Sequence, residues 1–387
     1  MKAQITRSII LMAALTTPVA SYAKSVVAQE TPVHTTAQSE IHQPRIQLAL
    51  LLDTSNSMDG LINQARNQIW QMVDEFASAR KNGLPPIVEV AILEYGNDNL
   101  SAETGYIRKV TALTTELDRV SEALFALTTN GGSEYCGYAI ETAVNQLQWS
   151  DSPHDLKTII IAGNEPFTQG PRDYRKAIAA ARSKDININT IFAGQYQKGI
   201  QTGWQQGAHL AQGNYMNIDQ NQVVTHIAAP QDQRLAQLNE KLNDTYIPYG
   251  QQGQESAQRQ QEQDQKSQSI APGLLSKRAK SKASSAYKNE QWDLVDALDS
   301  GTTELEAVDK AMLPAPMQRM SDKEQVEYIE SKKQERKAIQ EEIQVLVEAR
   351  EAFVAEQSTT PAEEATVSGA LMKAVKSQAQ DKSFSFE

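Results

Sequence analysis

Apolar runs separated by amphipathic stretches occupy residues 45–228. Residues 46–52 (IQLALLL) are continuously apolar, which is typical of a central strand buried on both faces. The same criteria predict strands at 88–93, 106–110, 156–162, 186–193 and 215–218, and helices at 61–76, 117–127, 138–147, 174–182, 204–211 and from 222. Strands that alternate with helices at this spacing predict an α/β fold with a doubly wound, mostly parallel sheet.

The rest of the chain is more polar and is expected to be divided into five segments. A Gln-, Thr- and Ser-rich stretch at 24–44 predicts a disordered lead-in, and 229–249 predicts a helical extension. Residues 250–272 contain almost no apolar side chains, so we expect a flexible Gln-rich linker there. A helical region is expected at 273–357, followed by a disordered tail at 358–387.

The last long helix of the helical region is predicted to open at Ser321 with a capping box completed by Glu324. Its apolar positions fall on one side, together with many charged residues: Ile329, Ile339, Ile343, Leu346 and Phe353. This pattern fits a coiled coil or helical hairpin that binds a partner. It also fits a helical unit that packs on itself or on the α/β domain.

The N-terminal residues indicate export. Lys2 and Arg7 precede an apolar stretch at 9–15, and small residues at 20–23 resemble a cleavage site. This is the pattern of a cleavable signal peptide, assigned to residues 1–23. No cysteine follows it for lipid attachment, and no other segment has the roughly 20 apolar residues of a membrane span. We therefore expect a periplasmic or secreted mature chain without a transmembrane segment.

Charge and cysteine content exclude several functions. The net charge is −11 and no basic stripe crosses the central region, which argues against a nucleic-acid partner. Cys136 is the single cysteine, so it cannot form an internal disulfide, and we expect a small buried side chain rather than a nucleophile. The five histidines lack metal-ligand spacing, and neither a phosphate-binding loop nor a nucleophile elbow is present. We do not expect catalysis.

The loop after the strand at 46–52 carries the most informative chemistry. In an open α/β sheet, ligands bind outside the carboxyl ends of the strands. Asp53, Ser55 and Ser57 alternate along this loop and can direct one carboxylate and two hydroxyls to one point. Such oxygen ligands suit Mg²⁺, or Mn²⁺ or Ca²⁺. An EF-hand is excluded because Met58 replaces the required Gly and Gln64 the bidentate Glu.

Two later loops repeat this chemistry in chain order. Ser133 follows a Gly pair before a predicted helix, and Asn164 follows Gly163 after a predicted buried strand. Together with Asp53-Thr54-Ser55-Asn56-Ser57, these loops resemble the metal-ion-dependent adhesion site of von Willebrand factor A domains, over residues 46–228. Ser133 stands where that family has Thr, and Asn164 where it usually has Asp.

The resemblance implies a doubly wound α/β domain that binds a divalent cation and, through it, an acidic side chain of a protein partner. The metal ligands that it implies are Asp53, Ser55, Ser57, Ser133 and Asn164. Glu134 and Glu165 lie beside two of them and are expected to shape the partner contact. The amide of Asn164 should lower the affinity for the cation, unless Glu134 or Glu165 compensates.

Two other functions stay open at this point. One is a periplasmic scaffold that assembles through its C-terminal helices and carries a degenerate, metal-free A domain. The other is an enzyme, which would need a pocket that joins Cys136 or His209 to an acidic group.

Overall fold

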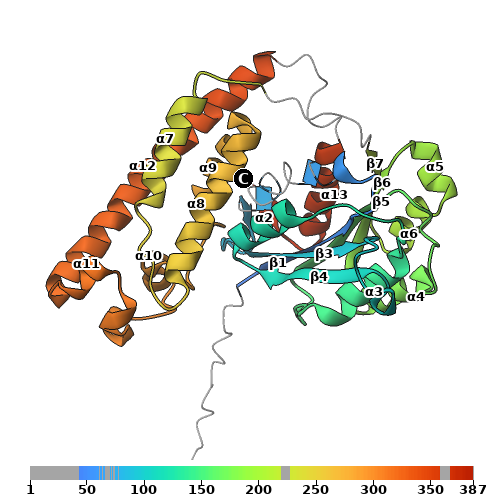
Figure 1. Ribbon diagram of the computed structural model, residues 1–387, viewed down its shortest axis with the longest axis horizontal. Coiled ribbons are helices and arrows are strands. Elements are labelled where there is room, and N and C mark those ends of the chain that lie inside the picture. The colour runs from blue at the N-terminus through green and yellow to red at the C-terminus, as the bar shows by residue number, and fades with distance from the viewer. Residues whose placement is uncertain are drawn as a thin grey trace, which may run out of the picture. The chain divides into compact units, whose positions relative to one another are not determined.

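The computed structural model describes residues 43–60, 62, 64, 65, 70, 72, 75, 76, 78–218, 227–357 and 367–386. Within them, six strands form one sheet in the order β4-β3-β1-β5-β6-β7 (Figure 1). The strands are β1 (Arg45–Asp53), β3 (Ile87–Tyr95), β4 (Ile107–Thr114), β5 (Leu156–Gly163), β6 (Asn187–Ala193) and β7 (Tyr215–Ile218). All neighbours pair in parallel except β4, which is antiparallel to β3. The predicted mostly parallel sheet is confirmed.

Helices cover both faces of this sheet because alternate side chains of each strand enter opposite cores. Leu48 and Leu50 of β1 share one core with Leu124 of a helix, whereas Ala49 and Leu51 share the other core with further helices. The helices of this part are η1 (Ala102–Thr104), α2 (Leu117–Ala126), α3 (Cys136–Gln146), α4 (Tyr174–Ser183), α5 (Tyr196–Gln201) and α6 (Trp204–Leu210). We call residues 45–218 the sheet domain.

Several sequence predictions fall wholly or partly outside the described residues. The signal peptide at 1–23 and nearly all of the lead-in at 24–44 lie there. So does the start of the helix predicted from residue 222, and the helix predicted at 61–76 is described only in part.

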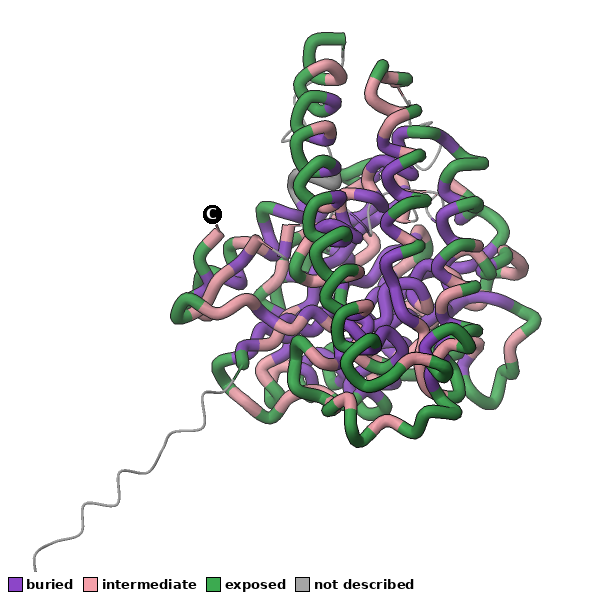
Figure 2. Tube along the Cα trace, turned by 90° about the vertical axis from the view of Figure 1, so that its left-hand side faces the viewer, coloured by how far each residue is buried: buried purple, intermediate pink, exposed green. Residues whose placement is uncertain are grey.

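A set of helices follows the sheet domain, and we call residues 232–357 the helical arm. Its elements are α7 (Asp232–Asn243), α8 (Gly253–Ile270), α9 (Pro272–Lys282), α10 (Leu294–Asp299), η2 (Leu305–Ala307), η3 (Lys310–Met312), α11 (Ala315–Gln318) and α12 (Asp322–Gln357). Helices α7, α8, α9 and α12 run side by side (Figure 1). The apolar side of α12 is buried in the chain itself, where Ile343 and Val347 share a core with Leu238 of α7. Figure 2 shows buried positions along one side of the long helices and exposed positions along the other.

The structure differs from the linker expected at 250–272, because α8 occupies most of this segment. Its buried face is polar and includes Gln260 and Gln263. Gln260 Nε2 donates to the Tyr287 hydroxyl over 3.0 Å, and Ser121 Oγ of α2 donates to Gln263 Oε1 over 3.2 Å. These hydrogen bonds pair much of the buried face, although Gln263 Nε2 finds no partner among the described residues, so the face needs few apolar residues. A hydrophobicity pattern therefore does not reveal the helix.

A buried ionic cluster joins the helical arm to the sheet domain. Arg278 of α9 is fully buried and forms ion pairs with Asp118 of α2, at 2.7 Å, and with Asp264 of α8. Lys282 pairs with Asp264 over 3.0 Å. We call these four residues the joint. The two cations and two carboxylates balance, so the buried charges are mutually compensated.

The C-terminal residues also differ from the disordered tail expected at 358–387. Residues 367–386 form α13 (Val367–Asp381) and β8 (Ser385–Phe386), and β8 pairs antiparallel with β2 (Ala79–Arg80). Helix α13 contacts β5 and β7 (Figure 1). Gln378 Oε1 accepts from the hydroxyl of Thr158 on β5 and the amide of Asn189 on β6. The end of the chain thus returns to the sheet, so the helical arm is inserted in the sequence between β7 and this last helix.

Candidate metal site at the carboxyl edge of the sheet

Asp53 ends β1 in the centre of the sheet and is completely buried. Its Oδ1 accepts a hydrogen bond from the backbone amide of Ser55 over 2.8 Å, which curls the loop back over the strand end. The loop is tied to its neighbours through Thr54, whose amide donates to Tyr95 O over 2.8 Å and whose carbonyl accepts from Asn130 N over 2.9 Å. Backbone hydrogen bonds therefore fix the first loop against β3 and against the second loop.

Glu134 brings a second carboxylate to Asp53. Its side chain is 3% exposed and lies within hydrogen-bonding reach of the carboxyl of Asp53 and the hydroxyl of Ser55. Burial, together with the hydrogen-bonding contact and the charge of Glu134, raises the pKa of Asp53 well above its usual value. Burial likewise raises the pKa of Glu134. Two buried carboxylates that face each other favour either a shared proton or a bound cation.

The third loop supplies an amide. Asn164 Nδ2 donates to Ser57 Oγ over 2.8 Å, and Ser57 Oγ lies 3.4 Å from Ser55 Oγ. Asn164 Oδ1 and Asp53 Oδ2 are both buried, and neither accepts a hydrogen bond from any described residue. Buried acceptors without a donor are costly unless a cation or water reaches them. We call Asp53, Ser55, Ser57, Glu134 and Asn164 the rim site.

Glycines let the rim site close. A Cβ atom on Gly96, whose φ is 84°, would lie 2.8 Å from both Asp53 Oδ1 and Glu134 Cγ. A Cβ on Gly163 would lie 2.5 Å from the Tyr95 hydroxyl and 3.2 Å from Asp53 Oδ2. Any larger residue at these positions would push the carboxylates apart. The Tyr95 hydroxyl donates to Ala162 O over 2.9 Å and supports the site from below.

The predicted site residues are thus only partly brought together as expected. Hydrogen bonds and a close approach of hydroxyls connect Asp53, Ser55, Ser57 and Asn164 into one set. Ser133 is held by a backbone bridge to Gly96, and the neighbouring Glu134 is the residue that reaches Asp53. We had expected Glu134 to contact a partner, but its carboxylate points into the chain. The sequence signal for this role was an acidic residue directly after Ser133.

Glu165 takes a different position. The residue is exposed, and its backbone makes the structural contacts. Its amide donates to Glu134 Oε2 over 3.2 Å, and its carbonyl accepts from Trp204 Nε1 over 2.8 Å. The backbone amide of Glu165 therefore orients the Glu134 carboxylate, and the side chain of Glu165 is exposed to solvent. Sequence reasoning missed Trp204 and Gly96 as supports of the site.

The donor set fits a hard divalent cation. Two carboxylates, two hydroxyls and an amide oxygen are the ligand types that Mg²⁺, Mn²⁺ and Ca²⁺ accept. Among the described residues, no group of three or more His, Cys, Asp or Glu side chains is placed to hold a metal ion.

Comparison with known proteins identifies the domain that carries these loops. The family model of the von Willebrand factor type A domain matches residues 47–202. These residues form a von Willebrand factor A domain. The match lies within the sheet domain, which we call the A domain from here on. No curated protein matches the chain.

Several solved structures are similar to part of the chain. One is proximal thread matrix protein 1 from the mussel byssus with a zinc-occupied MIDAS motif, at 14% identity and a TM-score of 0.35, over 47% of this chain and 43% of that one. A von Willebrand factor type A protein from Catenulispora acidiphila is 17% identical, with a TM-score of 0.34 over 46% and 39% of the two chains. The SpRpn10 VWA domain is 16% identical, with a TM-score of 0.33 over 45% and 88%. This chain thus spans less than half of the first two.

Proposed function

We propose that this chain is a non-enzymatic protein-binding module of the cell envelope, whose A domain grips a partner through a divalent cation. The observation that carries the proposal is the buried carboxylate pair of Asp53 and Glu134. No described Lys or Arg forms an ion pair with either carboxylate. A pair of like charges that is buried without a counter-charge is expensive, and a bound cation removes that cost.

Asp53, Ser55, Ser57 and Glu134 would hold Mg²⁺, or Mn²⁺ or Ca²⁺, with Asn164 and Ser133 as further ligands. When bound, the cation supplies a positive charge that attracts an acidic side chain of the partner. Glu165 is exposed beside the site and would select the residues next to that acidic group. In this proposal, the cation attracts the acidic side chain of the partner, and Glu165 determines which residues can lie beside that side chain.

Glu134 also explains how the site tolerates Asn164. The amide removes one negative charge from the third loop, and Glu134 places one in the second loop. Asp53 and Glu134 therefore place two carboxylates near the cation. A site with Asp at position 164 and no acidic residue at position 134 would have the same number. Glu165 does not compensate in this way, because its side chain is exposed and its backbone holds Glu134.

The environment of Cys136 supports a non-enzymatic role. The thiol is 1% exposed and lies 3.8 Å from the Tyr95 hydroxyl. Burial raises the pKa of Cys136 well above its usual value, which disfavours the nucleophilic thiolate. His209 is exposed on α6, whereas Cys136 is buried.

Export remains part of the proposal on the strength of the basic and apolar pattern at residues 1–23. Within the described residues, none of the helices combines the length and the apolar composition needed to cross a bilayer.

The alternative is a scaffold with a metal-free A domain that assembles through the helical arm. One observation favours it. The raised pKa values of Asp53 and Glu134 would let the pair share a proton instead of a cation. The burial of the apolar side of α12 within the arm leaves less of that helix for assembly.

Calorimetric titration of the chelator-treated full chain with Mg²⁺ and Mn²⁺ tests the proposal. We expect saturable binding by the wild type and none by Asp53→Ala. Glu134→Gln should bind about tenfold more weakly, which corresponds to about 1.4 kcal/mol. The double variant Glu134→Gln/Asn164→Asp should recover most of that loss, because it moves the carboxylate back to the third loop. Glu165→Gln is the matched control and should bind like the wild type.

Absence of binding by the wild type would leave the metal-free scaffold as the function. The partner is sought by comparing proteins retained by the wild type with and without chelator, and by Asp53→Ala. A protein that both chelator and Asp53→Ala release is the expected partner. Retention that neither treatment changes would argue for assembly through the arm.

A further inference from the structure

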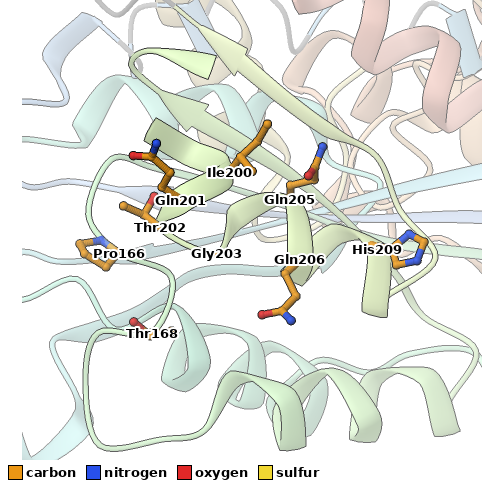
Figure 3. Close-up of a pocket in the computed structure, with 9 residues that line it drawn as sticks. All are labelled: Pro166, Thr168, Ile200, Gln201, Thr202, Gly203, Gln205, Gln206 and His209. Atoms are coloured by element: carbon orange, nitrogen blue, oxygen red, sulfur yellow. The ribbon is translucent and has the colours of Figure 1, made fainter. Parts of the chain in front are cut away.

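A groove of about 880 Å³ lies between the loop at residues 166–168 and the two helices α5 and α6 (Figure 3). The loop is the direct continuation of the third site loop, which carries Asn164 and Glu165. Most of the side chains that line the groove are polar and uncharged: Thr168, Gln201, Thr202, Gln205, Gln206 and His209. Neither the rim site nor its proposed cation accounts for this groove.

The walls of the groove are fixed by packing beneath them. The Phe167 ring contacts the rings of Tyr174 and Trp204 edge-on, at centroid distances of 5.1 and 4.9 Å. Phe167 N donates to Thr202 O over 2.9 Å, which joins the loop to the start of α6. A ligand would therefore meet a preformed surface and would not have to order it.

The lining chemistry suits peptide groups. A Gln side chain offers both a donor and an acceptor, as does a peptide group. Gln206 Oε1 accepts from the Tyr174 hydroxyl over 2.6 Å and from Arg175 over 3.3 Å, so its orientation is set and its nitrogen remains to donate. No carboxylate, Lys or Arg and no six-membered aromatic ring belongs to the lining residues. The lining residues therefore offer a ligand no carboxylate, Lys or Arg, and Arg175 is engaged with Gln206 and the Tyr174 ring.

The peptide of Glu165 connects the groove to the rim site. Its amide holds the Glu134 carboxylate and its carbonyl holds Trp204 of α6. The geometry points to the groove as the binding site for an extended, uncharged segment of the protein partner, adjacent in sequence to the acidic residue that reaches the cation. This inference rests on the proposed function, because the groove and the rim site form two parts of one contact surface.

The test uses the full chain in Mg²⁺ and a displayed library of random 12-residue peptides as the probe. Peptides selected on the wild type are synthesised and their affinities measured by fluorescence anisotropy. Gln205→Trp fills the groove from α6, and Thr168→Arg narrows it from the opposite loop. Both positions are exposed, so the fold should tolerate either change. Gln258→Trp, an exposed glutamine of α8 in the arm, is the matched control.

We expect both groove variants to weaken the selected peptides at least about tenfold, and the control to leave them unchanged. The calorimetric Mg²⁺ affinity of the groove variants should equal that of the wild type. Peptides that bind the groove variants as well as the wild type would overturn the inference. So would a library that yields no binder, or a glycan array in which groove-dependent binding is found for sugars and not for peptides.

The two proposals can fail separately. If the wild type binds no cation but Gln205→Trp still abolishes peptide binding in chelator, the groove is a peptide site and the metal-dependent function is wrong. If Mg²⁺ binds and Asp53→Ala releases the partner while both groove variants retain it, the metal-dependent function stands and the groove inference is wrong.

Discussion

The joint and the rim site each bury two carboxylates, but only the joint contains its own cations. At the joint, Asp118 and Asp264 meet Arg278 and Lys282. Burial alone would raise the pKa of Asp264, yet the charges of Lys282 and Arg278 lower it to about 2. At the rim site, the pKa of Asp53 is raised by burial and by Glu134. Two buried carboxylates are therefore paired with resident cations at the joint, whereas those of the rim site form no ion pair with a described Lys or Arg.

A third cluster lies between these extremes, and we call it the elbow. Asp293 and Asp296 share one cation, Arg336, whose Nη1 lies 2.7 Å from Asp293 Oδ2 and 2.9 Å from Asp296 Oδ1. Burial and the charge of Asp293 raise the pKa of Asp296 to about 7, although Arg336 opposes the shift. From joint to elbow to rim site, the number of resident cations for two carboxylates falls from two to one to none. The difference indicates that the rim site is the one suited to an external cation.

Removing a cation from the joint should have the largest effect. Arg278→Met leaves Asp118 and Asp264 buried with only Lys282 to compensate them, and loses the contact of the guanidinium with the Trp70 ring, 4.8 Å away. We expect the free energy of unfolding to fall by about 3–5 kcal/mol in urea titrations followed by circular dichroism.

Arg234→Met is the matched control, because Arg234 pairs with Glu342 on the surface at 2.6 Å and both side chains are more than 40% exposed. Its effect should not exceed about 1 kcal/mol. Equal effects of the two variants would mean that the joint is no more than a surface contact.

Replacing a carboxylate by its amide should change the free energy of unfolding in opposite directions at the joint and at the rim site. Asp264→Asn removes the partner of two buried cations and should lower the free energy of unfolding by about 3 kcal/mol. Glu134→Gln removes a like charge beside Asp53 and, in chelator, should raise it by about 1 kcal/mol. Urea titrations at pH 7 in EDTA measure both. If Glu134→Gln loses as much stability as Asp264→Asn, the carboxylates of the rim site are not an uncompensated pair of like charges.

The sequence predicts the centre of the sheet well because β1 and β5 are buried along almost their whole length and are mostly apolar. It also predicts that the loops that follow β1 and β5 lie side by side, since strand ends of a parallel sheet share one edge, and Asn164 contacts Ser57 there. The direction of Glu134 could not be predicted, because whether Ser133 or Glu134 faces inward depends on how the second loop bridges to Gly96. An adjacent pair of oxygen-bearing residues does not reveal which one is buried.

The helical arm and the C-terminal end were harder to predict for different reasons. Helix α8 buries Gln260 and Gln263 through hydrogen bonds, so apolar periodicity gives no signal there. Helix α13 does carry a signal, because Leu371, Val375 and Ala379 recur every four residues and are buried. The polar residues around them conceal it, and nothing in the sequence indicates that this helix returns to β5 and β7.

The elbow should make stability depend on pH in a way that the joint does not. The pKa of Asp296 is about 7 in the folded chain and about 3.9 when unfolded. The folded state therefore holds the proton more tightly than the unfolded state does. The contribution of this proton to the free energy of unfolding is complete below about pH 4 and is lost as the pH rises through 7. The other charged groups that act on Asp296 are Asp293, Arg336 and Lys288.

The measurement compares the free energy of unfolding at pH 5 and pH 8 in the wild type and in Asp296→Asn. The decrease from pH 5 to pH 8 should be larger in the wild type by about 2 kcal/mol, because the variant cannot release this proton. Groups that do not interact with Asp296 contribute equally in both proteins and cancel. Equal decreases would show that Arg336 neutralises Asp296 as fully as the cations of the joint neutralise Asp264.

The smallest effect is expected from adding a carboxylate to the rim site. Asn164→Asp puts a third acidic group near Asp53 and Glu134, and it replaces the amide that donates to Ser57. In chelator the added repulsion should lower the free energy of unfolding by about 1 kcal/mol. In Mg²⁺ the sign should reverse, because a cation that binds the folded state more tightly stabilises it further. Asn99→Asp, on a neighbouring exposed loop, should show neither change. Thermal unfolding with and without MgCl₂ measures both effects. If Mg²⁺ does not reverse the destabilisation of Asn164→Asp, the rim site resembles a pair of carboxyls that share a proton more than a cation site.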